Sequence, residues 1–548
     1  MTNMRMNKKR AILLLLAIFS VFSACKKDYL SFDYNDGNIT GEDVWASDLH
    51  TRGFLNNCYG GMLARYDLGD GSLLAAASDE AVNSNPNGAI VIFNNGTWGP
   101  LRTIDDQYAN MYNHIRRTNL FLENAATSGI APISDIPKLM GEAYFLRALY
   151  HFELMKRYGA IIIATKSFNP GEDLNLPKNS FEEVVNQIVA DCDAAAASLP
   201  DVTADLSSEN KGRATKSAAL ALKSRTLLYA ASPLNNADDN AAKWQRAADA
   251  AKELIDMNKL VLLTQAELPN LWNYTALPYN AEVIMATAAN NINSVELANA
   301  PISYNAGRGR TNPTQELVDA FEMRTTGKPI SDPTSGYSAT NPYANRDPRL
   351  AMFIVTNGSI FKSIVVETFV GGKDNNVTNP NSTKTGYYMR KFLTETNFWG
   401  TGAQTLSRKP WVLFRYAEVL LNYAEALNEA QGPVTDVYTY INRVRNRVSM
   451  PALPSDLTKE EMRERIQNER RVELCFEDHR FYDVRRWNKG VEYFDVPVSG
   501  MRITRSGSTL SYLRFEVEPR VFSEKMNRFP FPQAELNQAT KLVQNADW

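Results

Sequence analysis

One stretch of the sequence, from Glu469 to Trp487, alternates acidic and basic side chains among large apolar residues. Glu473 within it could serve as a catalytic acid or base, or it could pair with neighbouring arginines. A carboxylate flanked by several arginines stays ionised and paired, which favours the structural role. We therefore predict structural ion pairs for Glu473, Arg480 and Arg485, and no catalytic residue.

The common motifs of metal and nucleotide chemistry are absent from the sequence. The four histidines (His50, His114, His151 and His479) form no close cluster, and no H-E-x-x-H or paired C-x-x-C occurs. The chain also lacks a Walker A motif and a G-x-S-x-G motif. We expect no cofactor and no metal. Two well-placed carboxylates would suffice for a glycosidase, so a hydrolase stays open as an alternative.

The N-terminus carries a pattern typical of export and lipid attachment. Lys8, Lys9 and Arg10 precede an apolar run that is too short to span a bilayer, and Ser23 and Ala24 then stand before Cys25. Small residues ahead of a lone cysteine resemble a bacterial lipobox, in which the cysteine is acylated. We predict a signal peptide at 1–24, lipid attachment at Cys25 and a lipidated tether at 25–48. The alternative is an ordinary signal peptide in which Cys25 is incidental.

Charge and cysteine content restrict the partners and the redox chemistry. The first 24 residues hold four of the 59 basic residues and none of the 61 acidic ones, so the exported chain is net acidic. Nucleic acid is therefore not an expected partner. Beyond Cys25 only Cys58, Cys192 and Cys475 remain, which allows at most one disulfide. Cys192 lies on an apolar helical stripe and is expected in the core.

Any functional site must be positioned by the long helices that the sequence predicts. Ser180 with Glu183, and Thr458 with Glu461, form capping boxes that begin helices. Residues 141–158 are apolar on nearly every side, which predicts a central helix. Helix pairs with short turns, within 49–258 and again within 416–448, look like tetratricopeptide units. We predict a mainly α fold in which a loop-rich region, about 260–410, is displayed on a helical scaffold.

At this point the chain resembles the SusD/RagB family of outer-membrane nutrient-binding lipoproteins over nearly its whole length. Besides the lipobox, the matching segments are 141–148, 157–159, 212–216, 229–233, 313–321, 346–350, 414–422, 469–487, 529–532 and 542–545. One such motif would be weak evidence, but this many in order are specific.

The resemblance implies a fold, a location and a partner. The family has an α-helical fold in which tetratricopeptide-like units pack against a loop-rich ligand-binding part. It implies an N-terminal helical region at 49–258 and a RagB/SusD C-terminal region at 259–548. It also implies lipid anchoring in the outer membrane, facing the cell exterior, and a SusC-like TonB-dependent β-barrel transporter as partner. The tetratricopeptide face is the usual transporter contact in this family.

Local chemistry suggests which residues contact a ligand. Sugars are bound by aromatic faces, with amides, carboxylates and arginines satisfying the hydroxyls. Trp98, Asn95, Asp79, Tyr304 and Arg308 have that chemistry in or near expected loops. Each also has an ordinary explanation: Trp98 in the core, for example, and Arg308 as a solvated loop charge.

These observations lead to a non-enzymatic, cell-surface protein that binds oligosaccharides and delivers them to the transporter. Two alternatives stay open. One is a peptide-binding member of the same family. The other is a helical glycan hydrolase on the same membrane. The sequence does not identify the glycan, because aromatic and amide side chains serve every glycan class.

Overall fold

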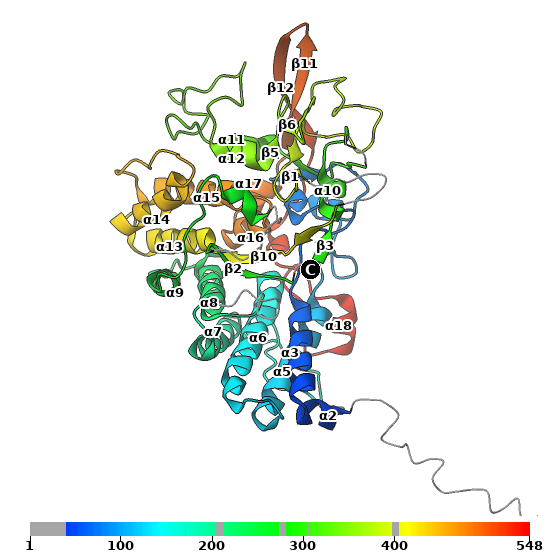
Figure 1. The fold of residues 1–548 in the computed structure, drawn as a ribbon, viewed down its shortest axis with the longest axis vertical. Helices are drawn as coiled ribbons and strands as arrows, with labels where there is room; N and C mark the ends of the chain where they lie inside the picture. The colour runs from blue at the N-terminus through cyan, green and yellow to red at the C-terminus, as the bar shows by residue number, and fades with distance from the viewer. Residues whose placement is uncertain are drawn as a thin grey trace, which may run out of the picture.

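The computed structural model describes residues 40–169, 171–202, 212–272, 281–288, 290–304, 306–396 and 405–548. Figure 1 shows helices gathered in one part of the molecule and loops with short strands in the other. The predicted signal peptide, Cys25 and most of the predicted tether lie outside the described residues.

The helical part is an array in which each long helix packs on the next. Contacts run from α5 to α6, α7, α8 and α9, then to α13 and α14, although about 160 residues of sequence separate α9 from α13. The long helices are α3 Asp48–Cys58, α5 Tyr108–Asn124, α6 Ile136–Tyr158, α7 Phe181–Ser198, α8 Lys216–Ala231, α9 Ala241–Asp256, α13 Tyr416–Gln431, α14 Thr435–Asn446 and α15 Lys459–Glu473.

Short helices join and flank this array. They are α2 Gly41–Ala46, α4 Val91–Asn94, α10 Ser294–Asn299, α11 Gln315–Ala320, α12 Pro348–Phe353, α16 His479–Arg486, α17 Gly490–Phe494 and α18 Gln533–Gln538.

Local sequence signals account for where several helices begin and end. The Ser180–Glu183 pair forms a complete capping box at the start of α7, and the Thr458–Glu461 pair does so at the start of α15, as predicted. Helix α6 is buried around most of its circumference, so the prediction of a central helix is confirmed. It ends at Gly159, whose φ of 78° suits glycine.

The described strands form two-stranded antiparallel sheets, most of which join distant parts of the chain. The pairs are β1 Ala81–Asn83 with β4 Thr311–Pro313, β2 Val283–Ala286 with β10 Val412–Arg415, β3 Asn290–Ile292 with β9 Ser407–Lys409, β5 Ile354–Val355 with β8 Tyr388–Met389, β6 Ile360–Phe361 with β7 Ile364–Val365, and β11 Val498–Ser506 with β12 Thr509–Glu518. The β11–β12 hairpin projects at the end of the molecule opposite α2 (Figure 1).

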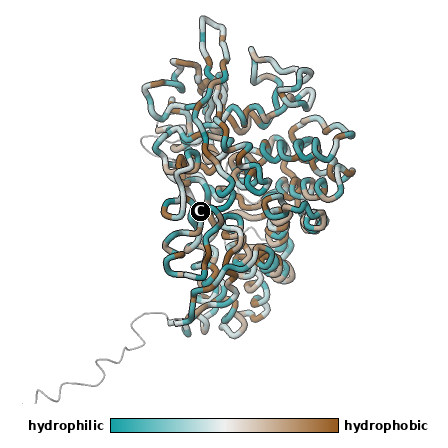
Figure 2. Tube along the Cα trace, turned by 180° about the vertical axis from the view of Figure 1, so that it is seen from behind, coloured by the Kyte–Doolittle hydropathy of each residue, from teal (hydrophilic) through white to brown (hydrophobic). Residues whose placement is uncertain are grey.

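The prediction of a mainly α fold is confirmed. Figure 2 shows hydrophobic and hydrophilic residues interleaved along the helices, as expected for helices that bury one face.

Among the described residues, no helix combines the length and apolarity that crossing a membrane requires. Cys58, Cys192 and Cys475 are free thiols in the interior, and Cys192 packs in the core as predicted. The boundary at 258/259 stays a prediction.

Candidate ligand-binding site

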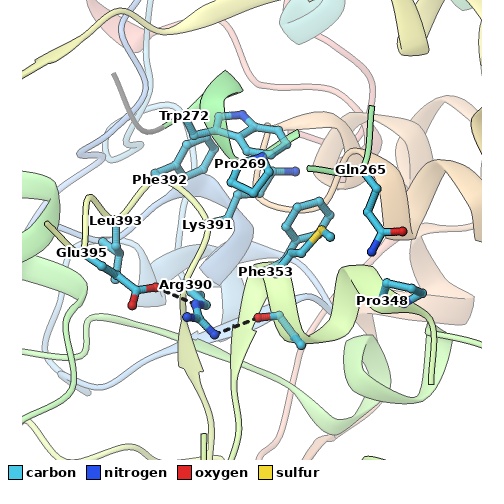
Figure 3. A pocket seen from close by; sticks show the side chains of 12 residues that line it. Gln265, Pro269, Trp272, Pro348, Phe353, Arg390, Lys391, Phe392, Leu393 and Glu395 are labelled. Atoms are coloured by element: carbon cyan, nitrogen blue, oxygen red, sulfur yellow. Dashed lines mark hydrogen bonds and ion pairs between the residues drawn. The ribbon is translucent and has the colours of Figure 1, made fainter. Parts of the chain in front are cut away.

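A cavity of about 450 Å³ opens in the loop-rich part of the molecule, a volume within the range of small-ligand sites. We call it the aromatic pocket (Figure 3). Its described lining is Gln265, Pro269, Trp272, Pro348, Ala351, Met352, Phe353, Arg390, Lys391, Phe392, Leu393 and Glu395.

Three chain segments converge to form the aromatic pocket. A 3-10 turn at Leu268–Leu271 leads into Trp272. Helix α12 is started by Asp347, whose carboxylate accepts the backbone N–H of Arg349 at 2.9 Å, with Pro348 at the first helical position. Strand β8, paired with β5 directly after α12, carries the chain into 390–396. The Asp347 cap, Pro348 and the β5–β8 pair together fix the position of α12 relative to residues 390–396. These two segments form two walls of the pocket.

The floor of the pocket is made of aromatic rings. Trp272 meets Phe353 edge-on with ring centroids 5.4 Å apart, and it meets Phe392 at 6.1 Å. The Lys391 ammonium lies 4.3 Å from the ring centroids of both Trp272 and Phe353. Edge-to-face packing and cation–π attraction hold these rings in one arrangement.

Lys391 is itself tied to the interior. Its ammonium donates to the Cys475 carbonyl at 2.9 Å and to the Glu477 carboxylate at 2.7 Å. Arg415 also binds Glu477, at 2.8 Å. Burial raises the pKa of Glu477, but Arg415 and Lys391 outweigh it and hold that pKa below its usual range. The Glu/Arg-rich stretch at 469–487 thus supports the pocket from beneath.

Polar groups line the rim. The Arg390 guanidinium donates to the Glu395 carboxylate at 2.7 Å and to the Ala351 carbonyl at 3.1 Å (dashed lines, Figure 3). The Gln265 carboxamide has no hydrogen-bond partner among the described residues, and neither does the buried indole N–H of Trp272. Gln265, Arg390 and Glu395 thus supply donors and acceptors at the rim, whereas the Trp272 N–H is buried beneath it.

Trp98 lies in the core instead of at this pocket. It is 4% exposed and packs against Phe93, Phe529 and Trp548 with ring centroids 4.7–5.1 Å apart. Trp98 also does not belong to the described lining of the aromatic pocket, which supports the core interpretation. Nothing in the sequence around Trp98 revealed that Trp548, at the other end of the chain, packs on it.

The Asp79 carboxylate is paired with two arginines. Arg480 binds both carboxylate oxygens of Asp79 at 2.8 Å, and Arg471 lies 2.9 Å from one of them. Asp79 is 4% exposed, so the structure gives it a buried structural pair in place of a ligand-facing position. The ion pair predicted for Arg480 is thus made with a residue predicted to contact the ligand.

Tyr304 contacts strand β6, which leads to the rim of the pocket. Its hydroxyl donates to the Phe361 carbonyl on β6, and the two rings meet edge-on at 5.2 Å. The turn after β6 reaches the rim, because the backbone N–H of Lys362 donates to the Glu395 carboxylate at 3.1 Å. Tyr304 is buried, so it does not face the cavity itself. It supports the rim indirectly, through its contacts with β6.

Asn95 and Arg308 are exposed, and neither belongs to the described lining of the aromatic pocket. The Asn95 side chain accepts hydrogen bonds from the backbone N–H and hydroxyl of Thr97, at 3.1 and 2.6 Å, and so shapes a turn. The five residues suggested by the sequence therefore do not gather around one cavity.

Glu473 lies in a buried network of charges. It pairs with Arg415 at 2.6 Å, with Arg349 at 2.9 Å and also with Arg447. Burial raises the pKa of Glu473, but the three arginines outweigh it and hold that pKa well below the usual range.

The prediction of an ion pair for Arg485 is wrong. Within the described part of the chain no carboxylate pairs with it; its guanidinium donates to the carbonyls of Met526 and Phe481, at 3.1 and 2.8 Å. It also stacks on the Phe481 ring, 3.5 Å from the centroid. Asp483, two residues away, is taken by Arg470 and Arg486. Spacing along the chain did not show which arginines would pair with the Asp483 carboxylate.

Comparison with family models places most of the chain in two related families. Residues 281–548 match the model described as SusD family. Residues 46–228 match a SusD-like model described as starch-binding and associating with the outer membrane.

Known proteins agree with this match. A SusD-like protein of Formosa agariphila is 25% identical over 424 residues, which are 72% of this chain and 74% of that protein. A SusD-like crystal structure from Bacteroides fragilis is 28% identical, covering 93% of this chain and 99% of that one with a TM-score of 0.80. A structure described as a laminarin-binding SusD-like protein is 23% identical with a TM-score of 0.65, covering 92% of this chain and 100% of that one, and shows the fold alone.

Proposed function

We propose, from the premise that this chain belongs to the SusD/RagB family, that it is a cell-surface protein that binds oligosaccharides in the aromatic pocket. It would deliver them to a SusC-like TonB-dependent transporter in the outer membrane. The laminarin-binding relative and the starch-binding family description support a glycan as the ligand class.

The single observation that carries the proposal is the composition of the pocket. Trp272, Phe353 and Phe392 line an apolar floor to which each contributes only a small exposed part of its side chain, 1–3%, while Gln265 and the Arg390–Glu395 pair provide amide, carboxylate and guanidinium groups at the rim. Sugar rings have apolar C–H faces edged by hydroxyls, so they match an aromatic floor with a polar rim.

Anchoring and transporter contact belong to the same proposal. Acylation at Cys25 would hold the protein on the membrane, since several acyl chains bind far more firmly than one. The described chain begins beside α2, at the end of the molecule opposite the β11–β12 hairpin (Figure 1). We assign the transporter contact to the tetratricopeptide-like helix array, as in the family. Asn95 and Arg308, both exposed, remain proposed ligand contacts outside the described lining of the aromatic pocket.

The hydrolase alternative has less support from the geometry. Glycoside hydrolysis generally needs two carboxyl groups that flank the scissile bond. Among the described lining residues only Glu395 carries one, and it is paired with Arg390. A binding role therefore fits the pocket better than cleavage does. A peptide ligand remains the other outcome of the test below.

The test is titration calorimetry of the chain from Lys26, with Cys25 removed, against a panel of oligosaccharides. Each mixture is also assayed for new reducing ends. Saturable heat without cleavage is expected, whereas new reducing ends would indicate an enzyme. Heat only with peptides would indicate the other branch of the family.

A matched pair of variants locates the site. Gln265→Ala is expected to weaken glycan binding about threefold to tenfold, the effect of one lost hydrogen bond of roughly 0.5–1.5 kcal/mol. Gln538→Ala, at an exposed position outside the described pocket lining, is the control and should bind like the wild type. Equal affinities of the two variants would place the ligand elsewhere, and Arg308→Ala would then test the proposed contact at Arg308.

A further inference from the structure

We propose that the aromatic pocket selects uncharged oligosaccharides over those that carry uronate or sulfate groups. This inference rests on the proposed function, since it names the ligand class of the same site. It follows from how the two cations of the described lining are paired.

Two cations occur in the described lining, and each is paired with a carboxylate. Arg390 binds Glu395 at 2.7 Å, and Lys391 binds Glu477 at 2.7 Å. Recognition of carboxylate or sulfate usually relies on an arginine or lysine that is available to the ligand. Within the described lining, no cation is left without a carboxylate partner.

Arg390 is held on three sides. Besides Glu395, its guanidinium donates to the Ala351 carbonyl at 3.1 Å and to the Ile360 carbonyl at 3.3 Å. Glu395 in turn accepts the backbone N–H of Lys362 at 3.1 Å, and the Lys362 ammonium donates to the backbone carbonyl of Glu395 at 2.7 Å. An anionic ligand would meet a guanidinium whose charge Glu395 already neutralises, and it would lie close to that carboxylate. A sugar hydroxyl needs only a remaining N–H of Arg390 or a lone pair of Glu395, so the pair serves it intact.

Lys391 faces the interior instead of the ligand. Its ammonium is fully buried and is taken up by the Glu473 and Cys475 carbonyls and the Glu477 carboxylate. Its aromatic contacts place Trp272 and Phe353 beside the charge. An ammonium has three donors, and these acceptors account for them. A ligand anion would gain little from it.

Desolvation also favours uncharged ligands at this pocket. An anion brought against an apolar floor without a free cation would lose hydration that nothing replaces. Uncharged hydroxyls lose much less, and the rim amide and ion pair restore their hydrogen bonds.

The first test compares neutral and acidic oligosaccharides of similar length by calorimetry at two salt concentrations. Neutral β-glucan, α-glucan, xylan and mannan fragments form one set; oligogalacturonate, alginate and sulfated galactan fragments form the other. We expect saturable binding in the neutral set, at least tenfold tighter than any acidic ligand and little changed by salt. Tighter binding of an acidic ligand, weakened by salt, would overturn the inference while supporting the proposed function. Silence in both sets would overturn the proposed function itself, and the inference with it.

The second test creates the missing free cation. Glu395→Gln keeps the shape of the side chain but removes the charge that neutralises Arg390, which its two carbonyl partners still hold. The variant should bind acidic fragments at least fivefold more tightly than the wild type does. Glu464→Gln, an exposed position on α15, controls for the change in net charge and should leave both ligand sets unaffected. An unchanged preference in a folded Glu395→Gln protein would show that the Arg390–Glu395 pair does not set the selectivity.

Discussion

Glu473 shows how a residue that looks catalytic in the sequence can be structural. Its carboxylate is fully buried and lies among the guanidinium groups of Arg349, Arg415 and Arg447, which come from three separate segments of the chain. A base that must accept a proton near neutral pH needs a raised pKa, and three arginines have the opposite effect. The network therefore joins distant segments of the chain, and its role is to stabilise the fold.

Removing this charge should unfold the protein more easily. Glu473→Gln leaves three arginines without their common partner, and breaking a buried ion pair in this way costs about 3–5 kcal/mol. Denaturant titration should show the loss. Glu464→Gln on the same helix has an exposed side chain and should change the free energy of unfolding by less than about 0.5 kcal/mol. Full stability together with lost ligand affinity would contradict the structural role.

Glu80 leads to a prediction of pH dependence. Burial raises the pKa of Glu80 to about 8, and the neighbouring Asp79 carboxylate acts in the same direction. A carboxyl whose folded pKa exceeds its unfolded value of 4.5 favours the fold fully below pH 4.5. That contribution declines as the pH rises to about 8. Glu80 thus makes the fold less stable in mildly alkaline solution.

Glu80→Gln should remove this decline, because a neutral amide resembles the protonated acid. The wild type and the variant are compared in melting temperature at pH 5 and pH 8.5. The variant should gain on the wild type as the pH rises, on the order of 1.4 kcal/mol for each unit of pKa shift removed. Other groups titrate in this range, so the difference between the two proteins is the readout. Parallel curves would mean that Glu80 is ionised in the fold.

At the scale of elements, the sequence predicted what depends on near neighbours in the chain. The capping boxes at Ser180 and Thr458 and the central helix α6 follow from residues within one or two helical turns. The aromatic pocket depends instead on pairings such as β5 with β8 and on the contact of Lys391 with Cys475 and Glu477. No local pattern encodes those pairings, which is why Trp272 was one aromatic among many in the sequence.

The β11–β12 hairpin is attached by a close approach that only glycine permits. A Cβ at Gly500 would lie 2.6 Å from the Cα and carbonyl oxygen of Thr385, and the adjacent Met501 N–H donates to that carbonyl at 2.7 Å. Gly500→Ala must push the 385 loop away from β11, at a cost of about 1–3 kcal/mol.

Hydrogen exchange should detect this change as faster exchange along β11 and its partner strand. Gly53→Ala is the matched control, because a Cβ at Gly53 in α3 meets nothing within 4 Å. That variant should be stabilised by up to about 1 kcal/mol through helix propensity. If both variants unfold like the wild type, the loop and the hairpin are more loosely joined than the geometry indicates.

For the whole molecule, the two sequence halves are interlocked. Helix α13 packs on α9 and α8, so the helix array is completed by residues beyond 400. Charge pairs join the same halves: Arg225 binds Glu418 at 2.6 Å, and Asp79 binds Arg480 at 2.8 Å. A boundary at 258/259 follows the change of composition in the sequence, but the contacts cross it. Contacts between distant parts of a chain leave no trace in composition, which is why the sequence predicted a boundary and not the contacts that cross it.

The fragment 49–258 should therefore not fold by itself. Without α13 it would expose the part of α9 that packs on α13, and it would leave Arg225 and Asp79 without their partners. We expect a fragment that aggregates or melts without a cooperative transition in circular dichroism. Cooperative melting near the temperature of the full chain would instead make 49–258 an independent domain.

A nicked chain separates this effect from failed expression. Asn258 is exposed directly after α9, so a protease site inserted there can be cut after the whole chain has folded. Because the contacts between the halves are buried and already formed, the two pieces should stay associated in size-exclusion chromatography and melt as one unit. Separation into two pieces that each keep their helicity would show that the interlocking contacts are not what holds the array together.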